Sequence, residues 1–333
     1  MANKNLTIIV PIYRPSISLD DIFYNITKQK DQNFNVIVVI DHPNEEAFDS
    51  ITKFQEKFGS ETKIIINSAH QHIDLVLKQA AEYVQTDYIY VLYSYSKLKS
   101  EFTKHINEYL NKIALKPDVI EISSSLRGLV NFDFRKQKVE ENMVIDLDKN
   151  FDPLALATPF SFDCIIKSSI FSKVYETLKN KDMNLQYSPI LVYKSLIHAS
   201  TFTYLKTTWI EDWNYEIMLL NPKSISRGWN TILASATNLS EEKQQALRFA
   251  EFMDLAFYFA GYVGACKFKK NTQEARSIKN IKIALEAEIK KRMPTWIEET
   301  ETNPYFVRFN AKSLIKIIEN VSDWESILKK FLW

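Results

Sequence analysis

Two mostly apolar stretches, Leu6-Thr-Ile-Ile-Val-Pro-Ile-Tyr13 and Val36-Ile-Val-Val-Ile-Asp41, indicate how the chain folds. Both are rich in β-branched residues, which favours buried strands; Pro11 is expected to end the first strand after Val10, and Asp41 ends the second. Residues 18–30, between them, carry apolar side chains at helical spacing. The order strand, helix, strand is that of a β-α-β unit, in which the two strands run parallel.

Strands and helices continue to alternate along the first part of the chain. The further predicted strands are 63–66, 88–92 and 119–123, and the predicted helices are 44–58, 71–85 and 100–114. Because the strand segments are predominantly apolar, we expect an α/β fold with a mostly parallel sheet flanked by helices. Ligands of such sheets bind beyond the carboxyl ends of the strands. The loops concerned follow Val10, Ile40, Ile66 and Leu92.

The second part of the chain has a different pattern. Residues 125–235 are rich in aromatic side chains and less regular. Helical spacing returns in three segments, which are 240–268, 272–292 (ending before Pro294) and 311–332. The sequence therefore predicts an α/β domain over residues 1–235 and an α-helical C-terminal region over residues 236–333.

Composition excludes several classes of function. The net charge of the 333 residues is +1, which gives no reason to expect a nucleic-acid partner. With only 5 glycines the chain has neither a dinucleotide-binding G-x-G-x-x-G motif nor a P-loop. Its 2 cysteines, Cys164 and Cys266, form no disulfide framework and no zinc-finger spacing. The first residues lack a signal-peptide pattern and no apolar run is long enough to span a bilayer, so we expect a cytoplasmic protein.

The opening strands carry a family resemblance. Thr7-Ile-Ile-Val-Pro-Ile-Tyr13, a helix, and then Asn33-Phe-Asn-Val-Ile-Val-Val-Ile-Asp41 resemble the start of family 2 glycosyltransferases, which have the GT-A fold. Gln29 and Phe34 match the usual end of the helix and entry of the strand. The resemblance implies a hexosyl-transferring enzyme with a nucleoside diphosphate sugar of the UDP type as donor and a glycan, lipid or protein as acceptor. It also implies a nucleotide-binding half, 1–125, and an acceptor half, 126–235.

Four residues are assigned to the nucleotide by this resemblance. Tyr13 offers a flat face for a base, and Asp41 can accept a hydrogen bond from a ring N–H. Pro11 fixes the turn at the strand end. Lys78 lies in the segment where the family often has Ala-Arg-Asn, so it could meet the pyrophosphate as a point charge. A solvated helix lysine is the other interpretation of Lys78, and both stay open.

The sequence departs from the family after the fourth strand. There the family has Asp-x-Asp, which holds Mg²⁺ or Mn²⁺ against the diphosphate. This chain has Tyr93-Ser94-Tyr95 instead. Phenols can hydrogen-bond a phosphate but cannot balance the charge of a metal ion. We therefore assign Tyr93 and Tyr95 to the nucleotide, name no metal ligand, and expect a site that is atypical or independent of metal, although Mg²⁺ or Mn²⁺ stays possible.

The general base has two possible positions. In one register the family's acidic pair falls on Tyr187-Ser188-Pro189, which contains no acid, so the base is lost. In the other register the pair is Glu211-Asp212, flanked by Trp209 and Trp213, whose faces suit a sugar. Asp212 is the best available base, because no other acidic pair in this region lies near aromatic residues.

The altered motifs leave a second function open. A catalytically degenerate member of the family would bind a nucleotide, a glycan or a partner glycosyltransferase without transferring a sugar. His70 and His72, in the loop after the third strand, suggest either contacts to the diphosphate or surface histidines, and less readily a metal site. Basic clusters at 267–270 and 290–292 raise the possibility of peripheral contact with the inner face of the membrane, against plain packing on the α/β domain.

Overall fold

The computed structural model describes residues 4–15, 17–59, 62–133, 139–177, 188–213 and 220–330. These residues form one ten-stranded sheet. Its strands are β1 (Leu6–Ile12), β2 (Asn35–Asp41), β3 (Thr62–Asn67), β4 (Tyr88–Val91), β5 (Ser96–Leu98), β6 (Val119–Arg127), β7 (Phe132–Asp133), β8 (Ile145–Asp146), β9 (Cys164–Lys167) and β10 (Thr201–Trp213). The order across the sheet is β3-β2-β1-β4-β9-β6-β10-β5, with β7 beside β6 and β8 beside β10.

The first four strands are parallel, as the sequence predicts. Their side chains are almost all buried in β1, β2 and β4, which explains why these sequences are mostly apolar. Four later strands run against this direction, among them the short strands β7 and β8, which pair antiparallel with β6 and β10. Strand β9 lies antiparallel between β4 and β6, and β5 pairs antiparallel with β10 at the far edge. The sheet is therefore mostly parallel but mixed.

Helices cover both faces of the sheet. Those before the C-terminal region are α1 (Leu19–Thr27), α2 (Glu45–Phe58), α3 (Ile73–Ala81), α4 (Phe102–Lys112), α5 (Asp152–Leu156), α6 (Ser168–Thr177), α7 (Pro189–His198) and α8 (Pro222–Ser235), with a 3-10 turn, η2 (Ser161–Asp163). The chain steps from β1 to β2 and β3 on one side, then returns to β4 on the other side of β1. With right-handed crossovers, α1 and α2 lie on one face and α3 on the other. Ligands of open α/β sheets bind at such a reversal, beyond the carboxyl ends of β1 and β4.

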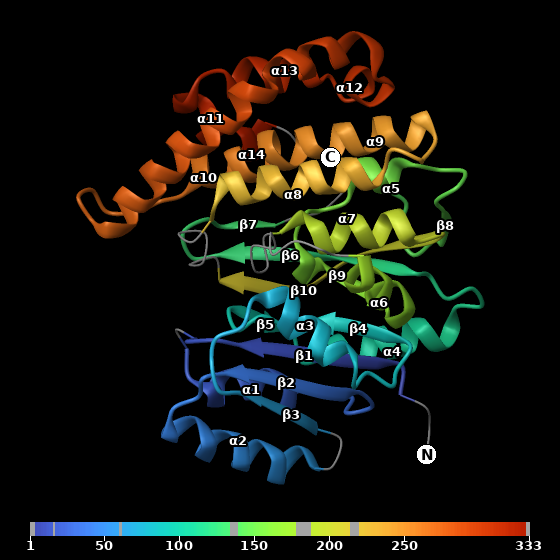
Figure 1. Ribbon diagram of the computed structural model, residues 1–333, viewed down its shortest axis with the longest axis vertical. Coiled ribbons are helices and arrows are strands. Elements are labelled where there is room, and N and C mark those ends of the chain that lie inside the picture. Colours follow the sequence, from blue (N-terminus) through green and yellow to red (C-terminus); the bar gives the residue numbers. More distant parts are fainter. Residues whose placement is uncertain are drawn as a thin grey trace.

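The C-terminal helices gather at the end of the molecule opposite β3 and α2 (Figure 1). They are α9 (Glu241–Met253), the π-helical segment η5 (Asp254–Phe259), α10 (Ala260–Ala265), α11 (Gln273–Thr302), α12 (Pro304–Arg308), α13 (Ala311–Ile318), the 3-10 turn η6 (Val321–Ser326) and α14 (Ile327–Lys330). The predicted helix 240–268 is thus one helical run with a wider π turn inside it. No helix in the described part of the chain combines the length and apolarity that a bilayer crossing requires.

One helix boundary predicted from the sequence is wrong. Helix α11 continues through Pro294 to Thr302, although a proline was expected to end it. Proline removes one helical hydrogen bond, but packing can offset that loss. Beyond it, the buried Trp296 packs edge-on against Phe252 of α9, with ring centroids 5.1 Å apart.

The basic cluster at 290–292 is engaged in ion pairs. Lys290 and Lys291 pair with acids on their own helix, and Arg292 Nε lies 2.6 Å from Glu251 Oε1 of α9. Arg292 also donates to the Ser226 carbonyl on α8. Part of this cluster therefore joins α11 to α8 and α9.

Candidate functional site

The carboxyl ends of β1, β2 and β3 meet at one edge of the sheet. Tyr13 follows β1, Asp41 ends β2 and Asn67 ends β3. Asp41 and Asn67 are direct partners in the strand register. Although Asp41 is an acid, it is only 4% exposed, so hydrogen bonds must replace the water it has lost.

Those hydrogen bonds come from three donors beyond β2. Asn67 Nδ2 donates to Asp41 Oδ1 at 2.8 Å, and the backbone N–H of Gln71 donates to Oδ2 at 2.7 Å. His70 Nδ1 lies 3.2 Å from the same Oδ2. Because an ionised carboxylate only accepts, Nδ1 of His70 carries the hydrogen. The carboxylate of Asp41 is thus fixed in direction by charge-assisted bonds.

Tyr13 reaches the same place from β1. The residue is 39% exposed, and its ring stacks on the His70 ring, with centroids 3.7 Å apart and planes 18° from parallel. The Arg14 guanidinium lies 5.4 Å from the Tyr13 centroid, within cation–π range. One imidazole therefore touches both the face of Tyr13 and the carboxylate of Asp41, which brings the two predicted nucleotide residues together.

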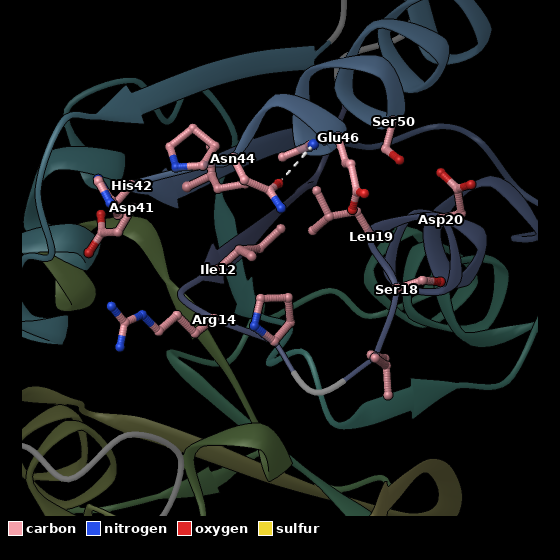
Figure 2. Close-up of a pocket in the computed structure, with 15 residues that line it drawn as sticks. Ile12, Arg14, Ser18, Leu19, Asp20, Asp41, His42, Asn44, Glu46 and Ser50 are labelled. Carbon is pink, nitrogen blue, oxygen red and sulfur yellow. Dashed lines mark hydrogen bonds between the residues drawn. The ribbon is translucent and has the colours of Figure 1, made fainter.

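A cavity of about 520 Å³ adjoins Asp41, between the loops that follow β1 and β2. This volume lies within the usual range for small-molecule sites. Figure 2 shows Arg14, Asp41 and His42 on one side of it and Ser18 and Asp20 on the other. Tyr13 and His70 are not part of its lining, so the stacked pair lies beside the cavity.

The two loops that frame this cavity hold backbone in a costly conformation. Arg14 has φ 42° and His42 has φ 48°, in the left-handed region that residues other than glycine seldom adopt. Such positions tend to gather at functional sites, because the surrounding structure must hold them there. The strained residues Arg14 and His42 thus lie at the same edge of the sheet as the hydrogen bonds to Asp41.

The other residues predicted to contact the nucleotide occupy different surroundings. Pro11 is a half-buried residue within β1, opposite Val39 of β2. Lys78 lies in the last turn of α3 and is exposed. Its neighbour Gln79 accepts a hydrogen bond from Asn67, which places this turn of α3 behind the Asp41 network.

The segment after β4 does not present acids. Tyr93 is buried, and its hydroxyl lies 3.0 Å from Ser161 Oγ. Tyr95 is half-buried, and its carbonyl accepts from the N–H of Trp213 at 3.1 Å. Nor do the described residues bring three or more His, Cys, Asp or Glu side chains together in a group that could hold a metal ion. The side chains present at this position do not fit a divalent metal.

Asp212 lies close to the end of β10, opposite Ser96 of β5, and its side chain is completely buried. Burial, reinforced by the nearby acids Asp163 and Asp212, raises the pKa of the Tyr90 hydroxyl well above its usual value. Asp212 and Asp163 therefore lie inside the protein, close enough to Tyr90 of β4 to act on its hydroxyl electrostatically. In the alternative register, Ser188 and Pro189 begin helix α7, while Tyr187 lies outside the described residues.

Sequence reasoning missed several members of this site. Asn67 and Gln71 hold Asp41, and Asp163 lies beside Tyr90, but none was named from the sequence. Asn67 could have been found, because neighbouring parallel strands that end together place their last side chains in contact. His72, which was considered together with His70, pairs instead with Asp74 at 2.7 Å.

Known proteins share the fold of this chain. No protein-family model matches the sequence, and comparison with curated proteins finds no match. Residues 1–349 of S. aureus TarS share 13% identity over 98% of this chain and 90% of that chain, with a TM-score of 0.62. The same part of TarS in complex with UDP-GlcNAc has 13% identity, the same coverage and a TM-score of 0.60. The mannosyltransferase PcManGT from Pyrobaculum calidifontis, in complex with GDP-Man and Mn²⁺, has 10% identity over 99% and 88% of the two chains, with a TM-score of 0.53.

At these identities the likeness establishes the fold. The α/β prediction is confirmed: a mostly parallel sheet flanked by helices is followed by a helical C-terminal region. The chain has the GT-A-like fold of proteins whose structures hold nucleotide sugars.

Proposed function

We propose that the protein is a glycosyltransferase that takes a sugar from a nucleoside diphosphate sugar of the UDP type. The observation that carries this proposal is the convergence of Tyr13 and Asp41 at the carboxyl ends of adjacent strands, touching one planar ring. An aromatic face and a fixed acceptor are what a uracil ring needs. The fold neighbours with bound UDP-GlcNAc or GDP-Man support the same choice of donor.

The nucleotide is proposed to lie across the ends of β1, β2 and α3. Tyr13 stacks on the base, and Asp41 accepts a hydrogen bond from a ring N–H of the base. Pro11 fixes the backbone at the end of β1, which leads to Tyr13. Lys78, exposed on α3, reaches the diphosphate as a mobile point charge. Tyr95, half-buried after β4, and Tyr93, after rearrangement of its bond to Ser161, hydrogen-bond the diphosphate or the sugar.

The leaving diphosphate is proposed to be stabilised without a metal at the position after β4. PcManGT was solved with Mn²⁺, but here neutral phenols stand where the sequence pattern calls for carboxylates. Lys78 and backbone N–H groups can supply part of the charge stabilisation that the leaving group requires.

Asp212 is the proposed general base. In the reaction it would take the proton of an acceptor hydroxyl while that oxygen attacks the anomeric carbon and the nucleoside diphosphate departs. Because Asp212 is completely buried, it can do so only if donor or acceptor binding opens the end of β10. Asp212→Asn should then retain UDP binding and lose at least about 100-fold in transfer rate. An unchanged rate would remove Asp212 from the mechanism.

The burial of Asp212 also supports a second function. With Asp212 and Tyr93 both covered, the protein could bind a nucleotide, a glycan or a partner glycosyltransferase without catalysis. Hydrolysis of UDP-glucose, UDP-GlcNAc and GDP-mannose separates the two functions, since many transferases slowly pass the sugar to water. Nucleotide binding with donor turnover supports the enzyme, and binding without turnover of these donors supports the binding module. If no nucleotide binds, the enzyme is refuted, and a binding module would have to recognise a glycan or a partner glycosyltransferase.

A further inference from the structure

His70 occupies a position in this site that resembles a bound base. Its ring is planar, lies 3.7 Å from the Tyr13 ring and is almost parallel to it. At the same time its Nδ1–H points to Asp41 Oδ2 at 3.2 Å. A face on Tyr13 and an N–H on Asp41 are the same two contacts that the proposed function assigns to the nucleobase.

We infer that His70 is an internal occupant of the base position, which a nucleotide must displace in order to bind. This inference rests on the proposed function, since it concerns the same two contacts. His70 would thus set the affinity and the selectivity of the site: a base enters only if its contacts with Tyr13 and Asp41 exceed those of the imidazole.

The number of hydrogen bonds that Asp41 can accept indicates that a base replaces the His70 imidazole and does not bind beside it. Each carboxylate oxygen offers about two lone-pair positions. Oδ2 already accepts from His70 and from the backbone of Gln71. Oδ1 accepts from Asn67, the last residue of β3. A base N–H can therefore bond Oδ2 only where the imidazole N–H now lies.

The surroundings of His70 allow it to leave. Its side chain is 54% exposed, whereas that of Asp41 is 3% exposed. An ion pair or hydrogen bond with so exposed a partner is weak, because water competes for it. His70 lies in the bend between β3 and α3, and its bond to Asp41 is the one side-chain hydrogen bond it makes to the described residues. Gln71 keeps its own backbone bond to Asp41, so the loop stays anchored when the imidazole swings away.

His72 provides a matched control two residues along the chain. Its Nδ1 bonds Asp74 at 2.7 Å, and its side chain is 29% exposed. It contacts neither Tyr13 nor Asp41 among the interactions of the described residues. Removal of the His72 ring therefore changes the local charge and histidine content without emptying the base position.

The test is isothermal titration of UDP and GDP into the full-length wild type, His70→Ala and His72→Ala. If the imidazole competes with the base, His70→Ala removes a penalty and binds UDP about three- to tenfold more tightly than the wild type. His72→Ala should match the wild type. Equal or weaker UDP binding by His70→Ala, with binding by the wild type intact, would overturn the inference and leave the proposed function standing. If wild type and His70→Ala both fail to bind UDP and GDP, the proposed function and the inference fall together.

Discussion

Asp41 and Asn67, the last residues of two neighbouring parallel strands, face each other in register and are joined by a hydrogen bond of 2.8 Å. Asn67 is in turn bonded to Gln79 of α3 at 3.2 Å. The carboxylate proposed to receive the base is therefore held by the sheet and by a helix on its far side. Such support fixes a recognition group before the ligand arrives, which lowers the cost of binding.

Asn67→Ala should weaken UDP binding about tenfold, because Asp41 Oδ1 loses its partner and the carboxylate can turn away from the base. Gln79→Ala serves as the graded control, since it removes only the outer member of the network and should cost less. Calorimetric titration with UDP measures both. The support role is contradicted if Gln79→Ala costs as much as Asn67→Ala or if neither changes the affinity.

Lys78→Ala should weaken binding of UDP but leave binding of uridine unchanged, because the proposed contact is with the diphosphate alone. The loss should shrink as salt is added, since exposed charges are screened. Titrations with both ligands at low and high salt make the comparison. Equal losses for UDP and uridine would mean that Lys78 acts through the structure of α3. No loss of UDP affinity would mean that Lys78 is a solvated helix lysine without a ligand contact.

Gly264→Ala should lower the free energy of unfolding by about 1–3 kcal/mol. A Cβ at Gly264 would lie 2.4 Å from the carbonyl carbon of Trp324, and backbone cannot yield as a side chain can. Gly228→Ala is the control, because its Cβ would meet side-chain atoms of Ile190 at 3.3 Å, which can shift. Urea unfolding compares them; equal destabilisation would contradict the close packing of α10 on η6.

Asp254→Asn should stabilise the protein at neutral pH. Burial, opposed by the Trp229 hydrogen bond and aided by Glu251, raises the pKa of the Asp254 carboxyl well above its usual value. Its stabilising contribution is therefore complete below the unfolded pKa of about 3.9 and is lost as the pH rises toward the folded value. Asparagine stays neutral and can still accept from the Trp229 indole N–H.

The measurement is the free energy of unfolding of wild type and Asp254→Asn between pH 4 and pH 8. Their difference should be small at pH 4 and grow by up to about 1.4 kcal/mol per pH unit in favour of the variant. If the difference in unfolding free energy does not change with pH, folding does not raise the pKa of the Asp254 carboxyl, and the prediction is wrong.

The strands that build the site could be predicted because their burial requires apolar residues within each strand segment itself. Both faces of β1 and β2 are covered, so their sequences are mostly apolar. Strand β10 escaped prediction because Lys206 and Thr207 are exposed within it, where the register with β6 shifts and the alternation of period two is lost.

The partners within the site could be predicted only in part. Tyr13 and Asp41 follow strands, and the order of strands implies that they meet. The stacking of His70 on Tyr13 depends on the path of the loop after β3, which tertiary packing sets. The burial of Asp212 follows from the pairing of β5 with β10, which no local pattern around Ser96 indicates.

Asp41 is proposed to receive the base of a nucleotide without help from a metal at the end of β4. Calorimetric titration of UDP into wild type, Asp41→Asn and Asp87→Asn, each with and without Mn²⁺, tests this proposal. Asp87 is an exposed acid paired with Lys116 at the other end of β4, so its variant controls for loss of charge alone. We expect the wild type and Asp87→Asn to bind alike, Asp41→Asn to lose about 100-fold or more in affinity, and Mn²⁺ to have little effect. Binding by Asp41→Asn as tight as the wild type, or binding by the wild type only with Mn²⁺, would contradict the account.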